Sequence, residues 1–227
     1  MKYSGLLILV AGVCTALLGA YGIYAESAPL LRGGTNAFTR LNVMSDGSEP
    51  LGLSLLSQNY ALRDCQVALK AIDSPTVRLQ GNDFQARLPA LCSGIASQVL
   101  TDTPAHGQAH LILAMASARM GDLVAMDTHL RQSQALAPSE TRYADPRSAL
   151  AGANVAALSE DGLARYQSDL LLMLRSQSGV WTLAQRYIDS DVLRPEVTNL
   201  LPLLTPNQQS RFLGAVNQMI SMRGKRL

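Results

Sequence analysis

The first 25 residues constrain this chain more than any other segment. No residue from Tyr3 to Ala25 carries a formal charge, and the most apolar part runs from Leu6 to Ala20. At about 1.5 Å of rise per residue, such a helix reaches roughly 34 Å, whereas the hydrocarbon core of a bilayer is about 30 Å thick. The sequence therefore predicts a transmembrane helix over residues 1–25.

The same segment has several features of a secretory signal peptide. Lys2 gives it a basic start, and an apolar stretch follows. Its cleavage site is poor, because Ile23 lies where a small residue is preferred and Pro29 disfavours cleavage after Ala28. We therefore expect an uncleaved anchor, and removal of the segment after Ala25 is the alternative.

The charges that flank the segment predict its orientation. The amino terminus and Lys2 lie on one side, and Glu26 opens the other. Because basic flanks stay in the cytoplasm, we expect the bulk of the chain on the far side. The preference for arginine over lysine indicates a GC-rich bacterial genome. The expected location is thus the inner membrane, single-pass, with the C-terminal domain in the periplasm. A cleaved, periplasmic protein is the alternative.

Small residues recur on one face of the predicted transmembrane helix. Such residues let two helices approach closely in a membrane, so this face is a candidate docking stripe for another transmembrane helix. The alternative is that glycine is simply common in membrane helices. The residues of this predicted packing face are Gly5, Gly12, Thr15, Ala16 and Gly19.

The rest of the chain is predicted to be a linker and one helical domain. Residues 26–50 are interrupted by Pro29, Gly33-Gly34 and Asp46-Gly47, which indicates a linker. Residues 51–227 are poor in aromatic residues (5% of the chain) and rich in Leu, Ala, Val and Met. This composition favours helix packing over a β-sandwich, so the predicted class is all-α.

Helix starts are marked by a short polar residue followed by proline, at Thr103-Pro104, Asp145-Pro146 and Thr205-Pro206. Gln208 adds a capping-box arrangement to the last of these. Short loops favour antiparallel neighbours, hence stacked hairpins. The predicted helices span 51–72, 84–101, 105–119, 122–136, 146–158, 161–176, 180–189, 195–204 and 206–222.

Two of the three cysteines, Cys65 and Cys92, lie beyond the transmembrane segment. Each falls on the apolar face of a predicted helix, and two successive antiparallel helices would bring the thiols together. In an oxidising compartment they either pair as a disulfide or remain buried as small hydrophobic residues.

One window, residues 107–140, resembles a tetratricopeptide repeat and has the length of roughly 34 residues typical of that family. The match rests on Leu113-Ala114, the Gly121-Asp122 turn, Leu130 and Leu136-Ala137-Pro138. The departures are Met126 and Ser133 where the family usually has alanine, and His110 where it has tryptophan. The resemblance implies a right-handed stack of helix pairs whose concave side binds peptides or proteins. An ordinary helical bundle is the alternative.

No catalytic, cofactor-binding or metal site is predicted. His106, His110 and His129 are the only histidines, and Gly107 excludes the zinc-protease signature, so we expect surface or packing roles for them. No nucleophile elbow or phosphate-binding loop is present. A net charge of +2 with dispersed basic residues argues against nucleic-acid binding.

The sequence thus predicts a membrane-anchored, extracytoplasmic helical scaffold or adaptor rather than an enzyme. Its expected partners are proteins of a bacterial envelope assembly, in secretion or polysaccharide assembly, with no nucleic acid and no small-molecule substrate. The alternative is a non-catalytic accessory subunit of a membrane enzyme complex, held by its transmembrane helix.

Overall fold

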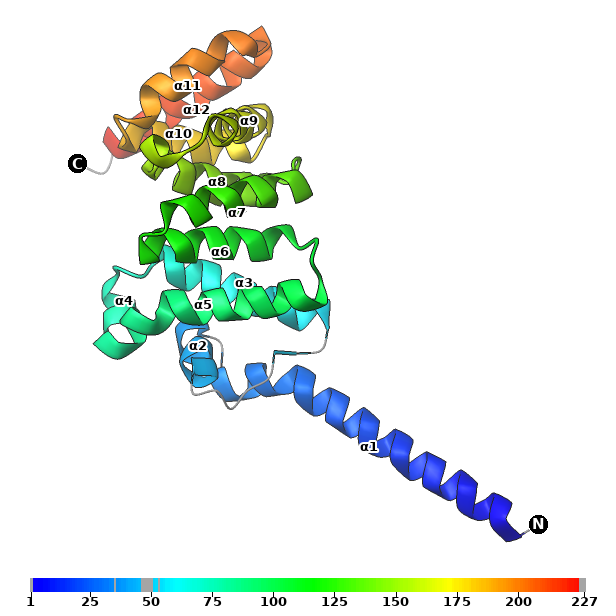
Figure 1. The fold of residues 1–227 in the computed structure, drawn as a ribbon. Helices are drawn as coiled ribbons and strands as arrows, with labels where there is room; N and C mark the ends of the chain where they lie inside the picture. Colours follow the sequence, from blue (N-terminus) through cyan, green and yellow to red (C-terminus); the bar gives the residue numbers. More distant parts are fainter. Residues whose placement is uncertain (1, 35, 46–50, 53, 225–227) are drawn as a thin grey trace. The chain divides into compact units, whose positions relative to one another are not determined.

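A computed structural model describes residues 2–34, 36–45, 51–52 and 54–224. These residues form twelve α-helices and two short 3₁₀-helices, and they contain no strand (Figure 1). The all-α class predicted from the sequence is therefore confirmed. The helices divide into two compact units, an N-terminal unit over Met1–Thr101 and a C-terminal unit over Asp102–Leu227.

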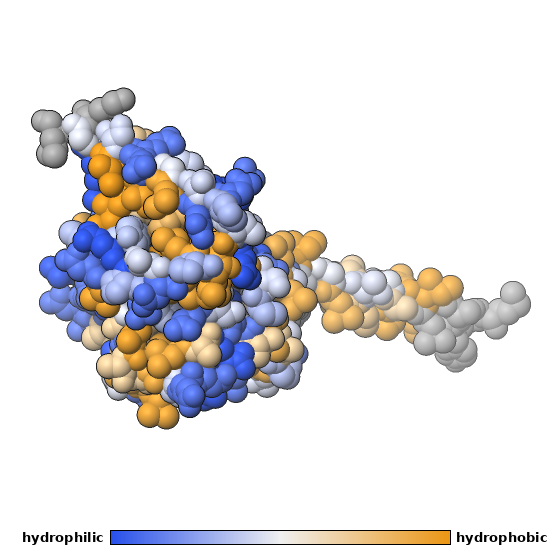
Figure 2. All heavy atoms as spheres, turned by 90° about the horizontal axis from the view of Figure 1, so that it is seen from above, coloured by the Kyte–Doolittle hydropathy of each residue, from blue (hydrophilic) through white to orange (hydrophobic). Residues whose placement is uncertain are grey.

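The N-terminal unit begins with a long continuous helix, α1, which packs against α2, and α2 packs against α3. The helices of this unit are α1 (Lys2–Gly33), α2 (Ala37–Ser45), α3 (Leu55–Lys70), α4 (Pro75–Arg78) and α5 (Asn82–Asp102). Within α1, the stretch Ile8–Ser27 is long and apolar enough to cross a membrane, a criterion that an N-terminal signal sequence also meets. Its hydrophobic side chains are exposed along the helix (Figure 2).

Much of the segment predicted to be a linker is helical. Helix α1 continues past its apolar stretch to Gly33, and α2 follows after a short turn. Burial explains the difference, because Ala25 and Leu41 are 1% and 0% exposed and tertiary packing outweighs the local glycine and proline signals. Residues 46–50, which include Asp46-Gly47, lie outside the described part of the chain.

Two polar contacts fix these first helices to α3. The carboxylate of Glu26 accepts hydrogen bonds from the backbone N–H and the hydroxyl of Ser54, at 2.6 and 2.7 Å. Ser54 is the N-cap of α3, so Glu26 lies at the positive end of that helix. Arg40 of α2 donates two hydrogen bonds of 2.6 Å to Asp64 of α3 and a third to the carbonyl of Gly34.

A disulfide joins α3 to α5. The Cα atoms of Cys65 and Cys92 are 5.5 Å apart, and both side chains are fully buried. Both lie on the apolar faces that the sequence indicated, so of the two alternatives left open by the sequence the structure has the disulfide.

The C-terminal unit is a series of helical hairpins. Helix α6 packs on α7, α8 on α9, and α10 on α12, and consecutive hairpins are in contact through α6–α8, α7–α9, α8–α10 and α9–α12. The helices are α6 (Gly107–Met120), α7 (Leu123–Leu136), α8 (Thr141–Ala153), α9 (Glu160–Arg175), α10 (Gly179–Asp189), α11 (Leu193–Leu200) and α12 (Pro206–Gly224). The 3₁₀-helices are Val155–Ala157 and Leu201–Leu203.

Local signals predicted some helix ends correctly and others not. Gly121 ends α6 with φ +81°, Asp122 caps α7, and Thr205 and Gln208 form the predicted capping box. By contrast, α8 begins before Pro146, and α6 is capped by His106 rather than by Thr103. Proline inside α8 removes only one N–H from the helix, and burial of the surrounding residues compensates for this loss.

The single domain predicted over residues 51–227 is also divided. Residues up to Thr101 cluster with α1 and α2, and the hairpin series starts after them. Within the N-terminal unit, the disulfide joins α3 to α5, and the contacts of Glu26 and Arg40 join α3 to α1 and α2.

Candidate functional site

A groove with a volume of about 370 Å³ lies between α8 and α10 in the C-terminal unit. This volume is within the range of roughly 300–1,000 Å³ in which proteins bind ligands. Four helices form it, namely α8 on one side, α9 at the floor, and α10 with the start of α11 on the other side. Its lining residues are Ala149, Gly152, Ala153, Tyr166, Arg186, Asp189, Ser190, Val192 and Leu193.

Two helices end at this groove. Helix α8 ends at Ala153 and α10 at Asp189, and both residues line it. The last carbonyls of a helix have no partner within the helix and carry a partial negative charge. Both helix ends therefore lower the electrostatic potential of the groove.

The floor of the groove is the side chain of Tyr166, which is 3% exposed. Its hydroxyl lies against Gly152, where a Cβ atom would approach the hydroxyl oxygen to 3.0 Å. No described residue forms a hydrogen bond with this hydroxyl, and Tyr166 is among the residues that line the groove. Burial raises the pKa of Tyr166 and the carboxylate of Glu196 raises it further, while Arg186 opposes the shift. The groove therefore contains a neutral hydroxyl that a ligand can engage.

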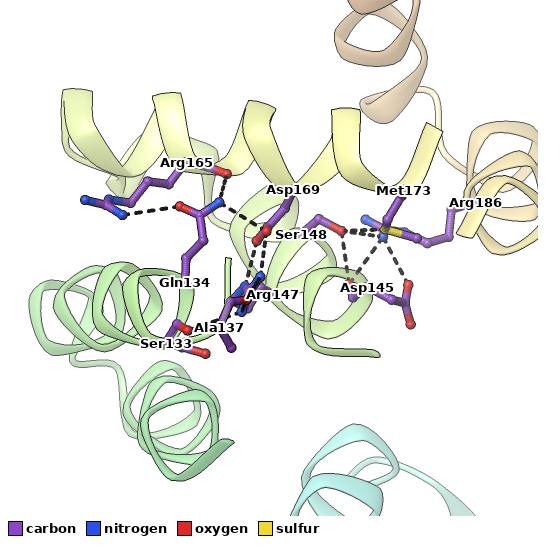
Figure 3. Close-up of polar contacts among 10 residues, drawn as sticks. All are labelled: Ser133, Gln134, Ala137, Asp145, Arg147, Ser148, Arg165, Asp169, Met173 and Arg186. Carbon is purple, nitrogen blue, oxygen red and sulfur yellow. Dashed lines mark hydrogen bonds and ion pairs between the residues drawn. The ribbon is translucent and has the colours of Figure 1, made fainter. Parts of the chain in front are cut away.

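Arg186 lines the groove, but its charge is compensated by acceptor groups on α8. Its Nη1 donates to the hydroxyl of Ser148 at 2.9 Å and to the Oδ1 of Asp145 at 3.3 Å (Figure 3). Figure 3 shows the guanidinium directed toward these two residues. Arg186 thus holds α10 against α8 and fixes the width of the groove.

Asp189 is the acidic side chain of the groove. It is about half exposed, accepts from Gln185 Nε2 at 2.6 Å and forms an ion pair with Arg223. The hydrogen bond from Arg223, followed by that from Gln185, lowers the pKa of Asp189. Its carboxylate is therefore ionised at neutral pH and remains accessible from the groove.

A buried ion pair supports the hairpins on which the groove is built. Arg147 of α8 is 1% exposed and donates to both carboxylate oxygens of Asp169 on α9, at 2.8 and 2.7 Å (Figure 3). The same guanidinium donates to the carbonyls of Ser133 and Ala137 at the end of α7, at 3.3 and 3.2 Å. Gln134 completes the cluster by donating to Asp169 and to a backbone carbonyl of α9. The guanidinium of Arg147 thus connects α7, α8 and α9.

The histidines lie together in the first hairpin. The Nδ1 atoms of His110 and His129 are 3.2 Å apart, and the two rings are stacked. The ring of His106 accepts from the backbone N–H of Ala109 and caps α6. Burial is the main cause that lowers the pKa of both His106 and His110. No group of three or more His, Cys, Asp or Glu residues in the described part of the chain is arranged to hold a metal ion.

The predicted packing face lies on α1 and is exposed. A Cβ atom added at Gly5, Gly12 or Gly19 would meet nothing within 4 Å, and Ala16 is exposed as well. The hydroxyl of Thr15 donates to a carbonyl of its own helix. A docking role for this face stays a prediction.

The groove itself was not predicted from the sequence. Helical spacing places Tyr166 on the apolar face of α9 but does not say that its hydroxyl faces a groove. Asp189 lies at a helix end, where an acidic residue in the sequence is usually interpreted as part of a turn. The residues of the groove come from four helices, and no local pattern connects them.

Comparison with known proteins gives no relative from which a site could be transferred. No family model, no curated protein and no solved structure matches the chain. The resemblance of residues 107–140 to a tetratricopeptide repeat therefore stays a prediction.

Proposed function

We propose that the protein is a membrane-anchored helical scaffold that holds a protein partner outside the cytoplasm, with the groove between α8 and α10 as its contact surface. The observation that carries this proposal is the groove itself. It is large enough for peptide side chains, and the hydroxyl of Tyr166, a residue that is 3% exposed, lies at its floor without a hydrogen bond to any described residue.

The order of helix contacts supports a repeat-like interpretation of the C-terminal unit. In a stack of helix pairs, the first helices of successive pairs contact one another, and so do the second helices. Here α6, α8 and α10 form one such series, and α7, α9 and α12 form the other. The groove lies between two members of the first series, which in tetratricopeptide-like stacks is the concave, binding side.

Contacts at the end of the apolar stretch support an uncleaved anchor. Cleavage after Ala25 would remove a residue that is 1% exposed. It would also put a positively charged amine on Glu26, whose carboxylate accepts two hydrogen bonds at the start of α3. The intact mass of the protein extracted from membranes checks this point, and a mass that lacks residues 1–25 would contradict it.

The disulfide supports a location outside the cytoplasm, because disulfides persist in oxidising compartments. In that location the anchor would confine the scaffold to the membrane surface and raise its effective concentration for a membrane-bound partner. A role in envelope assembly, in secretion or in polysaccharide assembly, fits this mechanism.

Affinity capture of the full chain from detergent-solubilised membranes tests the proposal. Ala153 is exposed at the rim of the groove, so Ala153→Trp should block the groove and abolish capture of the partner. Ala164→Trp, at an exposed position of α9 outside the groove lining, is the matched control and should leave capture intact. Full capture by the Ala153→Trp variant would overturn the proposal.

An accessory subunit of a membrane enzyme complex is the second candidate. It is favoured by the small-residue face of α1, against which nothing described packs. Deletion of residues 103–227 removes the hairpins and keeps the N-terminal unit. If the partner stays bound after this deletion and is lost when Gly12 and Gly19 become leucine, the accessory subunit replaces the scaffold.

A further inference from the structure

The charges around the groove are unevenly balanced. Its side chains and their ion-pair partners are Arg186 and Arg223 on the positive side, with Asp145 and Asp189 on the negative side. Glu196, close enough to Tyr166 to shift its pKa, adds a third negative charge. The carbonyl ends of α8 and α10 add to it.

Within the part of the chain that the structure describes, the two positive side chains at the groove are both in ion pairs. Arg186 is paired with Asp145 on α8, and Arg223 is paired with Asp189 itself. Helix α11 begins beside the groove with its positive end, but its first turn already carries Glu196. The groove therefore favours a positively charged occupant.

The shape of the groove suits a long side chain with an apolar stem. Ala149, Ala153 and Val192 provide apolar surface, and Tyr166 and Asp189 provide the polar groups. Lysine and arginine bury their methylene stems against apolar surface while the charged end finds acceptors. A small inorganic cation would leave the apolar part of this surface unused.

We propose that the groove between α8 and α10 binds a lysine or arginine side chain from an exposed segment of the partner protein. The charged end donates hydrogen bonds to the carboxylate of Asp189 and to the hydroxyl of Tyr166. The methylene stem lies on the apolar surface of α8 and of the α10–α11 turn. This inference rests on the proposed function and adds the chemistry of the partner.

The test uses the full chain in detergent and fluorescently labelled peptides of the form Gly-Ala-X-Ala-Gly, with fluorescence polarisation as the readout. X is lysine, arginine, norleucine or glutamate, so norleucine keeps the stem and removes the charge. Since one charge-assisted hydrogen bond contributes about 1.5–3 kcal/mol, the lysine and arginine peptides should bind about tenfold or more tightly than the norleucine peptide. The glutamate peptide should bind most weakly.

Three variants separate the roles of the two polar residues. Asp189→Asn and Tyr166→Phe should each weaken binding of the lysine peptide, and Tyr166→Phe removes a hydroxyl that no described residue uses. Arg223→Gln breaks the same ion pair as Asp189→Asn but leaves the carboxylate in place. It should therefore bind the lysine peptide as tightly as the unmodified protein, or more tightly.

Several results would overturn the inference. These are equal affinity for the lysine and norleucine peptides, absence of lysine-peptide binding at millimolar concentration, or unchanged affinity in Asp189→Asn. Loss of binding in Arg223→Gln to the same extent as in Asp189→Asn would show that only the ion pair matters, which also overturns it. If Ala153→Trp loses the captured partner but the lysine peptide fails to bind, only this inference fails. If Ala153→Trp retains the partner, the proposed function fails.

Discussion

The buried guanidinium of Arg147 gives the sharpest prediction about stability. Substitution by methionine keeps an unbranched apolar stem but removes both hydrogen bonds to Asp169, whose carboxylate is 4% exposed. Asp169 would retain only the bond from Gln134, at 3.1 Å. The carbonyl of Ser133 would keep its backbone donor, Ala137 N, at 3.1 Å, whereas the carbonyl of Ala137 would lose two bonds of 3.2 Å from Arg147.

An uncompensated buried carboxylate typically costs about 3–5 kcal/mol, and we expect Arg147→Met to lower the free energy of unfolding by this amount. Most domains are stable by only about 5–15 kcal/mol, so the change should be large in any equilibrium measurement. The chain has one tryptophan, Trp181 on α10, and it is 38% exposed. Its fluorescence during urea titration of the full chain therefore reports unfolding of the C-terminal unit.

Two controls complete the experiment. Arg142→Gln removes an exposed ion pair with Glu140 on the same helix and should cost less than about 1 kcal/mol. Combining Arg147→Met with Asp169→Leu replaces the buried pair by apolar groups and should recover most of the loss. An Arg147→Met variant within about 1 kcal/mol of the unmodified protein would refute the assignment of this ion pair as a structural support of the hairpins.

Three further predictions concern other parts of the molecule. Under denaturing, non-reducing conditions a maleimide should label only Cys14, and after reduction it should label all three cysteines. Two or more labels before reduction would contradict the disulfide. Loss of the disulfide should lower the free energy of unfolding by about 3.5 kcal/mol for this loop length. Because the folded-state pKa of His110 and of His106 lies below the unfolded value, the unfolded chain binds more protons as the pH falls below about 6.5. Stability should therefore be complete above that pH and decline below it, and thermal unfolding at pH 7.5 and 5.0 should show a smaller difference in His110→Gln. Glu26→Ala should weaken the start of α3 by about 1 kcal/mol, visible as roughly fivefold faster amide exchange in its first turn, and unchanged exchange would contradict this role.

The features that were predictable from the sequence are those with local causes. Gly121 and Asp122 mark the turn between α6 and α7 because one adopts positive φ and the other caps the next helix. Periodic apolar faces predicted that Cys65 and Cys92 point toward the core, where the two residues form a disulfide. The all-α class follows from the same periodicity.

The features that were missed depend on contacts between distant residues. Residues 26–33 and 37–45 are helical because Ala25 and Leu41 are buried and because Arg40 binds Asp64, a partner 24 residues away. The groove forms because Tyr166 of α9 and Asp189 of α10, which belong to different hairpins, line the same space. Neither of these contacts between distant residues produces a periodic pattern in the sequence.

The continuity of α1 has a mechanical consequence. No break separates its apolar stretch from the turns whose Glu26 is hydrogen-bonded to the start of α3. In the anchored protein proposed here, rotation of the membrane-spanning part of α1 about its long axis would therefore turn the rest of the N-terminal unit with it. One residue inserted into the apolar stretch would rotate the following turns by about 100° about the helix axis. The length of the apolar stretch therefore sets the direction in which the N-terminal unit faces.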